Sequence, residues 1–319
     1  MTNDVEIAIR ARNLSKTFGR LRAVADVDLT VARGQVYGFL GPNGSGKSTT
    51  IRMLCGLLTP SDGDIQVLGL RIPEQAEKLR QHIGYMTQHF SLFTDLTLWE
   101  NLQFLAAVQN LSRRQASLRV KELLQEYGFA GRASQLAGTL SGGQKQRLAL
   151  AGSIVHKPDL LFLDEPTSAV DPESRRDFWE KLFELADAGT TILVSSHYMD
   201  EAERCHRLAI LDRGHLVADG TPADLTGALR GRTLEVSAER PRQAKQLLMQ
   251  VSGVISAAQI GNSLRVLCDE VGDCAGRIER AFAAAGMSAE VSATTPSLED
   301  VFVAATNEHK AVELRGESV

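Results

Sequence analysis

The residues Gly41 to Ser48, with the sequence GPNGSGKS, have the composition and spacing of a loop that binds phosphate groups. They fit the pattern G-x-x-x-x-G-K-[ST], and an apolar run from Val36 to Leu40 leads directly into them. Glycines allow successive backbone N–H groups to turn toward an anion, and a helix that starts at the end of the loop adds the positive end of its dipole. The pattern therefore predicts a nucleoside triphosphate site.

The roles of individual loop residues follow from this chemistry. Lys47 would reach the β- and γ-phosphates, and the Ser48 hydroxyl would bind Mg²⁺. A glycine-rich turn before an ordinary helix is the alternative, but the apolar run before the loop and the helix-compatible run to Leu58 after it favour the phosphate site. We expect nucleotide contacts from the loop and the residue beyond it: Gly41, Pro42, Asn43, Gly44, Ser45, Gly46, Lys47, Ser48 and Thr49.

Two acidic residues follow another apolar run. Leu160 to Leu163 is continuously apolar, which is typical of a strand buried on both faces of a parallel sheet, and it ends at Asp164 and Glu165. Folds of this kind hold Mg²⁺ at the end of such a strand, so Asp164 is the expected metal ligand. Glu165 would orient or deprotonate an attacking water. Acidic residues are common at strand ends, and it is the pair together that supports a catalytic site.

A third segment, Leu140-Ser-Gly-Gly-Gln144, has the chemistry of a second anion site. Ser141 offers a hydroxyl, the two glycines allow close backbone approach, and a helix expected from Arg147 to Val155 would point its N-terminus at a phosphate. Ser141 would also serve as an ordinary N-cap, but that role does not account for the whole pentapeptide. In this segment the chain resembles the ATP-binding-cassette (ABC) ATPases, whose signature is LSGGQ, and the resemblance covers about residues 5 to 230.

The resemblance implies functions for further residues. Gln88 matches the glutamine that contacts Mg²⁺ and the nucleophilic water, His197 matches the switch histidine at the γ-phosphate, and Ser168 to Asp171 matches the D-loop. Phe18 matches the aromatic residue that stacks on adenine, commonly a tyrosine, and phenylalanine keeps the ring without the hydroxyl. The implied ligands are ATP and Mg²⁺, with the metal bound by Ser48, Gln88 and Asp164. The implied catalytic residues are Lys47, Gln88, Glu165 and His197.

The resemblance also implies a head-to-tail dimer of two ATP-binding subunits, most simply two copies of this chain. ATP would lie between the phosphate loop of one copy and the signature of the other, and closure would exclude water and align the nucleophile. We expect the additional contacts around ATP from Ser141, Gly142, Gly143, Gln144 and Asp171. Whether the second subunit is a copy of this chain or a different cassette stays open.

Composition bounds the other partners. The net charge of −4 and the pI near 6.0 give no reason to expect nucleic acid or an anionic membrane surface as a partner. No apolar run reaches the roughly 20 residues that span a bilayer, and the N-terminus lacks the features of a signal peptide. We therefore expect a chain that is soluble by itself and acts at the cytoplasmic face of the cell membrane through a separate, multi-spanning permease.

The cysteines indicate a reducing environment. The four residues lie scattered in the sequence without a C-x-x-C pair, which favours reduced thiols, with no disulfide framework and no zinc site. Cys268 and Cys274 are near one another in the sequence, and whether they meet stays open. The other two are Cys55 and Cys205.

Some segments resemble more closely the ATP-binding subunits of bacterial ABC-2-type exporters, the drug and antibiotic efflux class. They are Met86 to Leu92, Ser195 to Glu203 and Pro296 to Phe302. The resemblance implies an ATPase that powers export of a drug, antibiotic or related substrate. An apolar patch after Gln88 would either receive a cytoplasmic helix of the permease or form the core of the helical insertion. The patch consists of Phe90, Leu92, Phe93, Leu96 and Trp99.

Two other classes of function stay in view. A soluble ABC ATPase acting on ribosomes or DNA would carry two cassettes with a charged linker, or a long coiled coil between phosphate loop and signature, and the sequence has neither. Its acidic net charge also gives no basic stripe for nucleic acid. A P-loop kinase or GTPase would have no use for the segment from Leu140 to Gln144.

The order of the expected elements must position these residues. Strands alternating with helices predict a P-loop α/β fold, here an ABC ATPase domain at 5–230 with an antiparallel β subdomain and a helical subdomain at about 89–155. Beyond it, the order βαββαβ predicts a small α+β domain of ferredoxin-like type at 231–306. The polar, charged tail at 307–319 is expected to be disordered.

Overall fold

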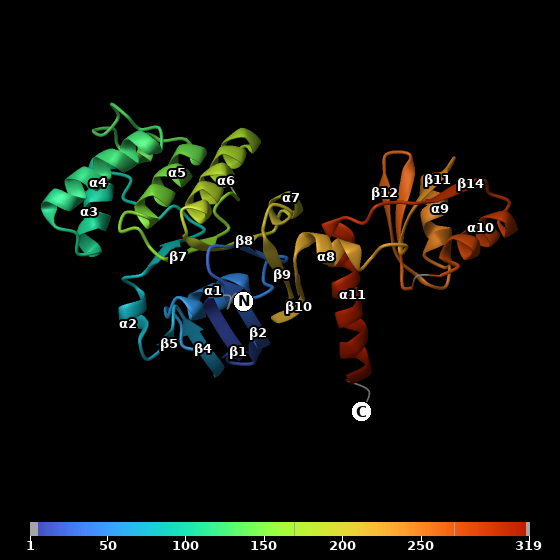
Figure 1. The fold of residues 1–319 in the computed structure, drawn as a ribbon. Helices are drawn as coiled ribbons and strands as arrows, with labels where there is room; N and C mark the ends of the chain where they lie inside the picture. The colour runs from blue at the N-terminus through green and yellow to red at the C-terminus, as the bar shows by residue number, and fades with distance from the viewer. Residues whose placement is uncertain (1–5, 169, 271, 317–319) are drawn as a thin grey trace, which may run out of the picture. The chain divides into compact units, whose positions relative to one another are not determined.

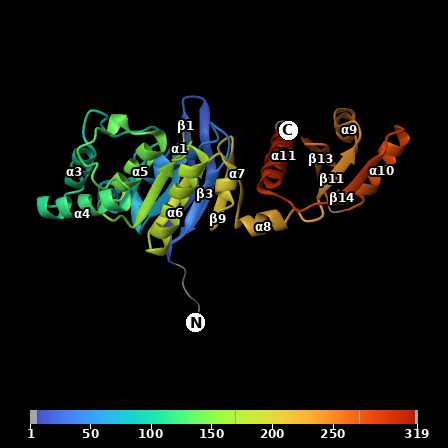
Figure 2. The same ribbon diagram turned by 90° about the horizontal axis from the view of Figure 1, so that it is seen from above.

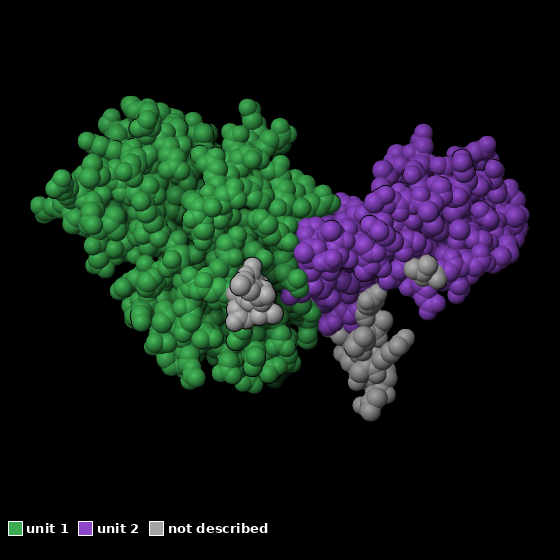
Figure 3. Space-filling view, in the orientation of Figure 1, with its two compact units in different colours: residues 1–216 green, residues 217–319 purple. Residues whose placement is uncertain are grey.

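The computed structural model describes residues 6–168, 170–270 and 272–316 of the 319-residue chain, with side chains as far as Asn307 and at His309. The chain divides into two compact units, residues 1–216 and 217–319, coloured separately in Figure 3. The division falls before the predicted boundary at residue 230, because helix α8 (Pro222–Gly227) packs against α11 (Leu298–Gly316) of the second unit.

A six-stranded sheet forms the centre of the first unit (Figure 1). Its strand order is β10-β9-β3-β8-β7-β6, and the pairs from β9 to β6 are parallel. Because parallel strands end at the same edge, the loops after β3, β6, β7 and β8 meet there. The strands are β3 (Val36–Leu40), β6 (Ile83–Met86), β7 (Leu160–Asp164), β8 (Thr191–Ser196), β9 (Arg207–Asp212) and β10 (His215–Gly220).

Strand β7 lies between two hydrophobic cores. Leu161 and Leu163 belong to one core, and Leu160 and Phe162 belong to the other. Successive side chains of a strand point to opposite faces, so a strand between two cores needs apolar residues at every position. The whole strand is buried through Asp164, which confirms the prediction made from its apolar sequence.

A four-stranded antiparallel sheet closes one of these cores, as the sequence predicts. Its order is β2-β1-β4-β5, and helix α1 (Lys47–Leu54) packs Ile51 and Met53 into the same core. The short helix α2 (Ala76–Leu79) follows this sheet. The strands are β1 (Ile7–Phe18), β2 (Leu21–Ala32), β4 (Asp62–Val67) and β5 (Leu70–Ile72).

Helices cover the other core (Figure 2). Helix α3 packs against α4 and α5, and α5 packs against α6. Capping boxes fix where α3 and α4 begin, through Thr97 with Glu100 and Ser112 with Gln115. The helices are α3 (Leu98–Val108), α4 (Arg113–Glu126), α5 (Gly142–Ser153), α6 (Pro172–Asp187) and α7 (Met199–Ala202), with a 3₁₀ turn at Ala137–Thr139.

The second unit has the predicted βαββαβ order. Its antiparallel sheet is ordered β12-β13-β11-β14, and Leu234, Val236 and Val266 pack against Phe282 in its core. This strand order and the two packed helices match a ferredoxin-like arrangement. The elements are β11 (Thr233–Ala238), α9 (Pro241–Leu248), β12 (Val254–Ile260), β13 (Ser263–Cys268), α10 (Cys274–Ala284) and β14 (Ala289–Ala293).

The prediction of reduced cysteines is wrong for one pair. Cys268 ends β13, Cys274 begins α10, and the two form a disulfide bond. The end of β13 and the start of α10 bring the two Cα atoms to 6.6 Å from one another, which their spacing in the sequence does not reveal. Cys55 and Cys205 are free, buried thiols.

The prediction of a disordered tail from Asn307 is wrong as far as Gly316. Helix α11 continues through this segment, and residues 317–319 lie outside the described residues. Leu298, Val301 and Ala304 are buried at the three-residue spacing of one helix face, so the start of α11 is held by packing.

Candidate functional site

The loop between β3 and α1 forms a groove. Gly46, the N-cap of α1, has a φ of +103°, and a Cβ added there would lie 2.7 Å from the carbonyl oxygen of Ala23. Glycine alone satisfies both constraints without strain. The groove has a volume of about 500 Å³ and is lined along its length by residues 43–49. The buried Ser45 hydroxyl has no hydrogen-bond partner among the described residues, and it suits a phosphate oxygen.

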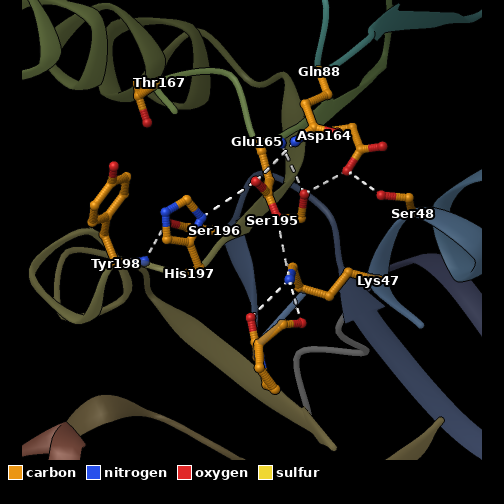
Figure 4. A network of polar contacts seen from close by, with 12 residues as sticks. Lys47, Ser48, Gln88, Asp164, Glu165, Thr167, Ser195, Ser196, His197 and Tyr198 are labelled. Atoms are coloured by element: carbon orange, nitrogen blue, oxygen red, sulfur yellow. Dashed lines mark hydrogen bonds and ion pairs between the residues drawn. The ribbon is translucent and has the colours of Figure 1, made fainter. Parts of the chain in front are cut away.

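Lys47 is buried in this groove. Its Nζ atom donates hydrogen bonds to the carbonyl oxygens of Gly41 and Pro42, at 2.7 and 3.1 Å, and lies 3.3 Å from Oε1 of Glu165 (Figure 4). An ammonium group is stable away from water only with such partners. The ammonium lies beside the loop, as expected for a lysine that contacts the terminal phosphates of a nucleotide.

Asp164 accepts two hydrogen bonds on one carboxylate oxygen. The hydroxyls of Ser48 and Ser195 both donate to its Oδ1 atom, each at 2.8 Å (Figure 4). The site thus pairs a hydroxyl from the end of the phosphate loop with a carboxylate from the end of β7. Oxygen ligands of this kind are those that Mg²⁺ prefers, so the two residues fit the predicted metal.

Three other predicted residues meet at Glu165. Its Oε2 atom accepts a hydrogen bond from Gln88 Nε2 at 3.2 Å and lies 3.3 Å from Nδ1 of His197, while its Oε1 atom faces Lys47. The backbone of Glu165 is left-handed, with a φ of +47°, and such a conformation costs about 1–3 kcal/mol for a residue with a Cβ. A buried carboxylate held in this way can orient a water molecule and accept its proton.

Phe18 lies at the rim of the groove. Its side chain is 47% exposed and lines the groove together with residues of the phosphate loop. The Nζ atom of Lys16 lies 5.2 Å from the centre of the ring, on which it makes a cation–π contact. The ring is therefore accessible to a planar ligand such as the predicted adenine.

The signature segment forms the start of α5. Ser141 caps the helix in a capping box with Gln144, with the Ser141 hydroxyl accepting from the Gln144 N–H at 3.4 Å. The helix therefore starts at Gly142 rather than at Arg147, the predicted start, because the cap fixes its first turn. In the described structure, residues 141–144 do not line the groove of the chain's own phosphate loop.

The second signature glycine contacts the segment that follows the D-loop. A Cβ added at Gly143 would lie 2.6 Å from Oγ of Ser174. Asp171 caps α6 by accepting a hydrogen bond from the Ser174 N–H at 2.9 Å, and hydrogen bonds from Ser174 lower the pKa of the Asp171 carboxyl. Within the predicted D-loop, Ala169 lies outside the described residues. The signature helix and the start of α6 are thus in contact within one chain.

One site residue, Ser195, has no individual role in the sequence prediction. Its hydroxyl accepts a hydrogen bond from the Glu165 N–H at 2.9 Å and donates to Asp164. In the parallel pairing of β7 with β8, Ser195 is the register partner of Asp164. The sequence does show a hydroxyl residue near the end of the strand before His197. It does not show that this residue pairs with Asp164, because the register between two strands cannot be derived from one sequence.

Comparisons with known proteins agree with this geometry. Residues 24–168 match the ABC transporter family. The chain is 47% identical over 220 residues to the probable multidrug ABC transporter ATP-binding protein YbhF of Escherichia coli (strain K12), covering 69% of this chain and 38% of that protein. It is 41% identical over 251 residues to the daunorubicin/doxorubicin resistance ATP-binding protein DrrA of Streptomyces peucetius, covering 77% of this chain and 76% of that protein. The chain belongs to the ABC transporter ATP-binding proteins.

The fold of this ABC protein agrees with a solved structure of an ATP-binding subunit of an ABC transporter. The TM-score is 0.63 at 32% identity, covering 69% of this chain and 92% of that chain. The family and the P-loop ABC ATPase fold predicted from the sequence are therefore confirmed. The chain spans only 38% of the length of YbhF. No helix in the described part of the chain is both long and apolar enough to cross a membrane.

Proposed function

We propose that this chain hydrolyses ATP and powers an ABC-2-type exporter. The observation that carries the proposal is the Glu165 carboxylate, which is fixed by a left-handed backbone beside the phosphate loop and is contacted by Lys47, Gln88 and His197. The similarity to DrrA, a drug-resistance protein by its name, extends over most of both chains. It supports a drug, antibiotic or related compound as the exported substrate.

The groove would bind ATP with its phosphates along the loop. The loop N–H groups, the N-terminus of α1 and Lys47 would bind the terminal phosphates, and Phe18 would stack on the adenine. Ser48 and Asp164 would hold Mg²⁺, which when bound neutralises negative charge on the phosphates. Gln88, predicted as a further ligand, donates its amide N–H to Glu165 in this structure.

Glu165 would act on the water that attacks the γ-phosphate. Its carboxylate would orient this water and accept its proton, while Gln88 and His197 keep the carboxylate aimed at the end of the phosphate loop. The bond from Ser195 to the Glu165 N–H fixes the backbone from which this side chain projects. Exclusion of bulk water would strengthen each of these contacts.

The signature would act on a second copy of the cassette. Ser141 and Gly142 are exposed, and they begin a helix whose N-terminus suits an anion. Because they do not line the groove of their own chain, a head-to-tail dimer would supply them to the γ-phosphate of the other copy. ATP would then hold the two copies together, and loss of the γ-phosphate would release them.

A separate groove, of about 450 Å³, would receive a cytoplasmic helix of the permease. It follows β6, close in sequence to Gln88, so a bound helix would be coupled to the residue that contacts Glu165. The chain would thereby act at the cytoplasmic face of the membrane, bound to a separate permease. The lining includes Met86, Thr87, Leu92, Leu105 and Val108.

The apolar patch predicted after Gln88 contains both partly buried and exposed side chains. The first kind fits a role in the core of the helical region, and the second fits contact with the permease. Phe90, Leu92 and Trp99 are partly buried and pack against the core of the helical region. Phe93 is 48% exposed and meets Phe104, itself 47% exposed, edge to face at 5.4 Å between ring centres. These two exposed rings support a docking surface beside the groove.

Replacing Glu165 by glutamine tests the proposed hydrolysis. Glu165→Gln keeps the shape of the side chain and removes the base, so ATP binding and ATP-dependent dimerisation should persist while phosphate release falls at least about 100-fold. Light scattering and a phosphate-release assay measure the two effects. Glu126→Gln, exposed at the end of α4, is the control. Full turnover by Glu165→Gln would remove Glu165 from this role.

Purification of the chain from native membranes tests the proposed export. We expect a multi-spanning protein to accompany it, and substitution of Phe93 and Phe104 by serine should weaken that association. Leu118→Ser, at an exposed apolar residue of α4, is the matched control. Association with ribosomes or DNA instead would favour a soluble ABC ATPase.

A further inference from the structure

A buried carboxylate lies behind the proposed catalytic residues. Glu201, on α7, has a relative exposure of 1%. Its Oε1 atom accepts a hydrogen bond from the Thr167 hydroxyl, and its Oε2 atom accepts one from the Ser196 hydroxyl, each at 2.5 Å. A buried carboxylate is costly unless its oxygens are hydrogen-bonded, and here both oxygens are.

The two hydroxyls come from the segments that carry the proposed catalytic groups. Thr167 follows Glu165 in the turn after β7, and Ser196 directly precedes His197 at the end of β8. The Ser196 hydroxyl also accepts a hydrogen bond from the Tyr198 N–H at 3.0 Å. Figure 4 shows Thr167 and Ser196 on the two segments that carry Glu165 and His197. One planar carboxylate therefore fixes the separation of these segments.

A cation connects the same network with α6. The Nε atom of Arg175 lies 3.5 Å from Oε1 of Glu201, and its guanidinium carbon lies 4.1 Å from the centre of the Tyr198 ring. The Tyr198 ring in turn lies 4.1 Å from the His197 ring, between centres. Helix α6 begins directly after Asp171, so Arg175 places the end of the D-loop in contact with the network around Glu201.

We propose that Glu201 is a positioning residue for ATP hydrolysis. It holds the segments that carry Glu165 and His197 in fixed positions relative to one another and to α6. Among the described contacts, Glu201 touches none of the groove-lining residues, so it acts through Thr167 and Ser196. This inference rests on the proposed function. Its consequence is that the network controls the rate of turnover and leaves nucleotide affinity unchanged.

A double-mutant cycle on the two hydroxyls tests this. Thr167→Val and Ser196→Ala should each lower kcat about tenfold with KM for ATP unchanged within about twofold, because the groove itself is untouched. Since both variants break the same connection, the double variant should also lose about tenfold rather than about a hundredfold. Thr226→Val, which removes a hydroxyl of α8, is the control and should leave kcat unchanged.

A second measurement needs no turnover. The ¹⁵N signals of the His197 ring should shift in Thr167→Val, because the effect passes through Glu201, and should stay in place in Thr226→Val. In the Glu201→Gln background, Thr167→Val should lose most of its effect on His197. All of these measurements use the full chain. If Glu201→Gln folds poorly, the measurements on the two hydroxyl variants can still be made, because those variants leave the carboxylate in place.

The outcomes separate the inference from the proposed function. Additive losses near a hundredfold, or a His197 signal that does not respond to Thr167→Val, would overturn the inference while ATP hydrolysis by the wild-type chain stands. Changes in KM rather than kcat would also overturn it, because they would assign the network to nucleotide binding. No hydrolysis by the wild-type chain would overturn the proposed function, and the His197 signals would still decide the coupling.

Discussion

The Nζ atom of Lys47 and the Oε1 atom of Glu165 lie 3.3 Å apart, and both side chains are more than nine-tenths buried. The pair joins the end of the phosphate loop to the turn after β7, two segments far apart in the sequence. One group has the charge to attract phosphate, and the other has the chemistry to accept a proton from water. Because both are buried, removing either side chain would leave the other as a buried charge without its partner.

Lys47→Met is expected to weaken ATP binding and to lower stability. The substitution leaves the Glu165 carboxylate buried without its cation, which typically costs about 3 kcal/mol. It also removes a phosphate contact, for which we expect about 100-fold weaker ATP affinity, or about 2.7 kcal/mol. Titration calorimetry and urea denaturation measure these effects. Lys121→Met, on the exposed face of α4, should change neither, and wild-type affinity in Lys47→Met would contradict the assignment.

Ser141→Ala is expected to separate capping from function when it is compared with Ser112→Ala. Both serines cap a helix through a capping box, so each substitution should lower the free energy of unfolding by about 1 kcal/mol. Only Ser141 belongs to the signature, so only Ser141→Ala should also lower ATP turnover, by at least about tenfold. Equal turnover in the two variants would limit Ser141 to its structural role.

The stability of the second unit is expected to depend on pH through Asp300. Burial alone would raise the pKa of this carboxyl, but hydrogen bonds from Arg265 and Ser297 outweigh it and hold the pKa below its ordinary value. A group with a lowered pKa in the folded state stabilises fully above its unfolded pKa, near 4, and this stabilisation is lost as the pH falls through the folded pKa.

Asp300→Asn should therefore lower the free energy of unfolding at pH 7 by about 2 kcal/mol, because it removes charged hydrogen bonds to Arg265. The difference from wild type should shrink toward zero as the pH falls below the lowered pKa of Asp300 in the folded state. Amide hydrogen exchange in the second unit measures it across this range. Glu299→Gln, at the exposed neighbouring residue, should show no such dependence.

Reduction of the disulfide between Cys268 and Cys274 is expected to destabilise the second unit. A crosslink that closes a short loop stabilises mainly by restricting the unfolded chain, by about 2 kcal/mol for this loop length. Hydrogen exchange with and without dithiothreitol measures the change. A variant with both cysteines replaced by alanine should be insensitive to the reductant. A loss of protection in that variant on adding reductant would show that the effect does not come from this disulfide.

Local patterns predicted the parts of the site that lie within one segment. Three motifs consist of consecutive residues, so their chemistry can be recognised in the sequence. They are the loop from Gly41 to Ser48, the acidic pair at Asp164 and the signature at Ser141. The structure brings Lys47 and Gln88 to Glu165 as the strand order requires, because the strands before them are parallel neighbours or share one edge.

Contacts that depend on register were not predictable. Ser195 reaches Asp164 because β7 and β8 pair at those two residues, and Glu201 reaches Thr167 through a turn of α7. Neither contact is marked by a fixed spacing of residues in the sequence. The tail after Asn307 illustrates another limit. Its charges suggested disorder, but several of its residues, among them glutamate, leucine and arginine, are strong helix formers, and it continues α11 as far as Gly316.

The position of β7 between two cores affects how variants of this protein should be interpreted. A cavity made on either side of the strand, at Leu161 or at Phe162, would displace the carboxylates at its end without altering any residue that touches nucleotide. The rate of ATP hydrolysis should therefore respond to changes in core packing on either side of β7. A distant substitution that slows turnover should be checked for loosened packing before it is credited with any part in the chemistry.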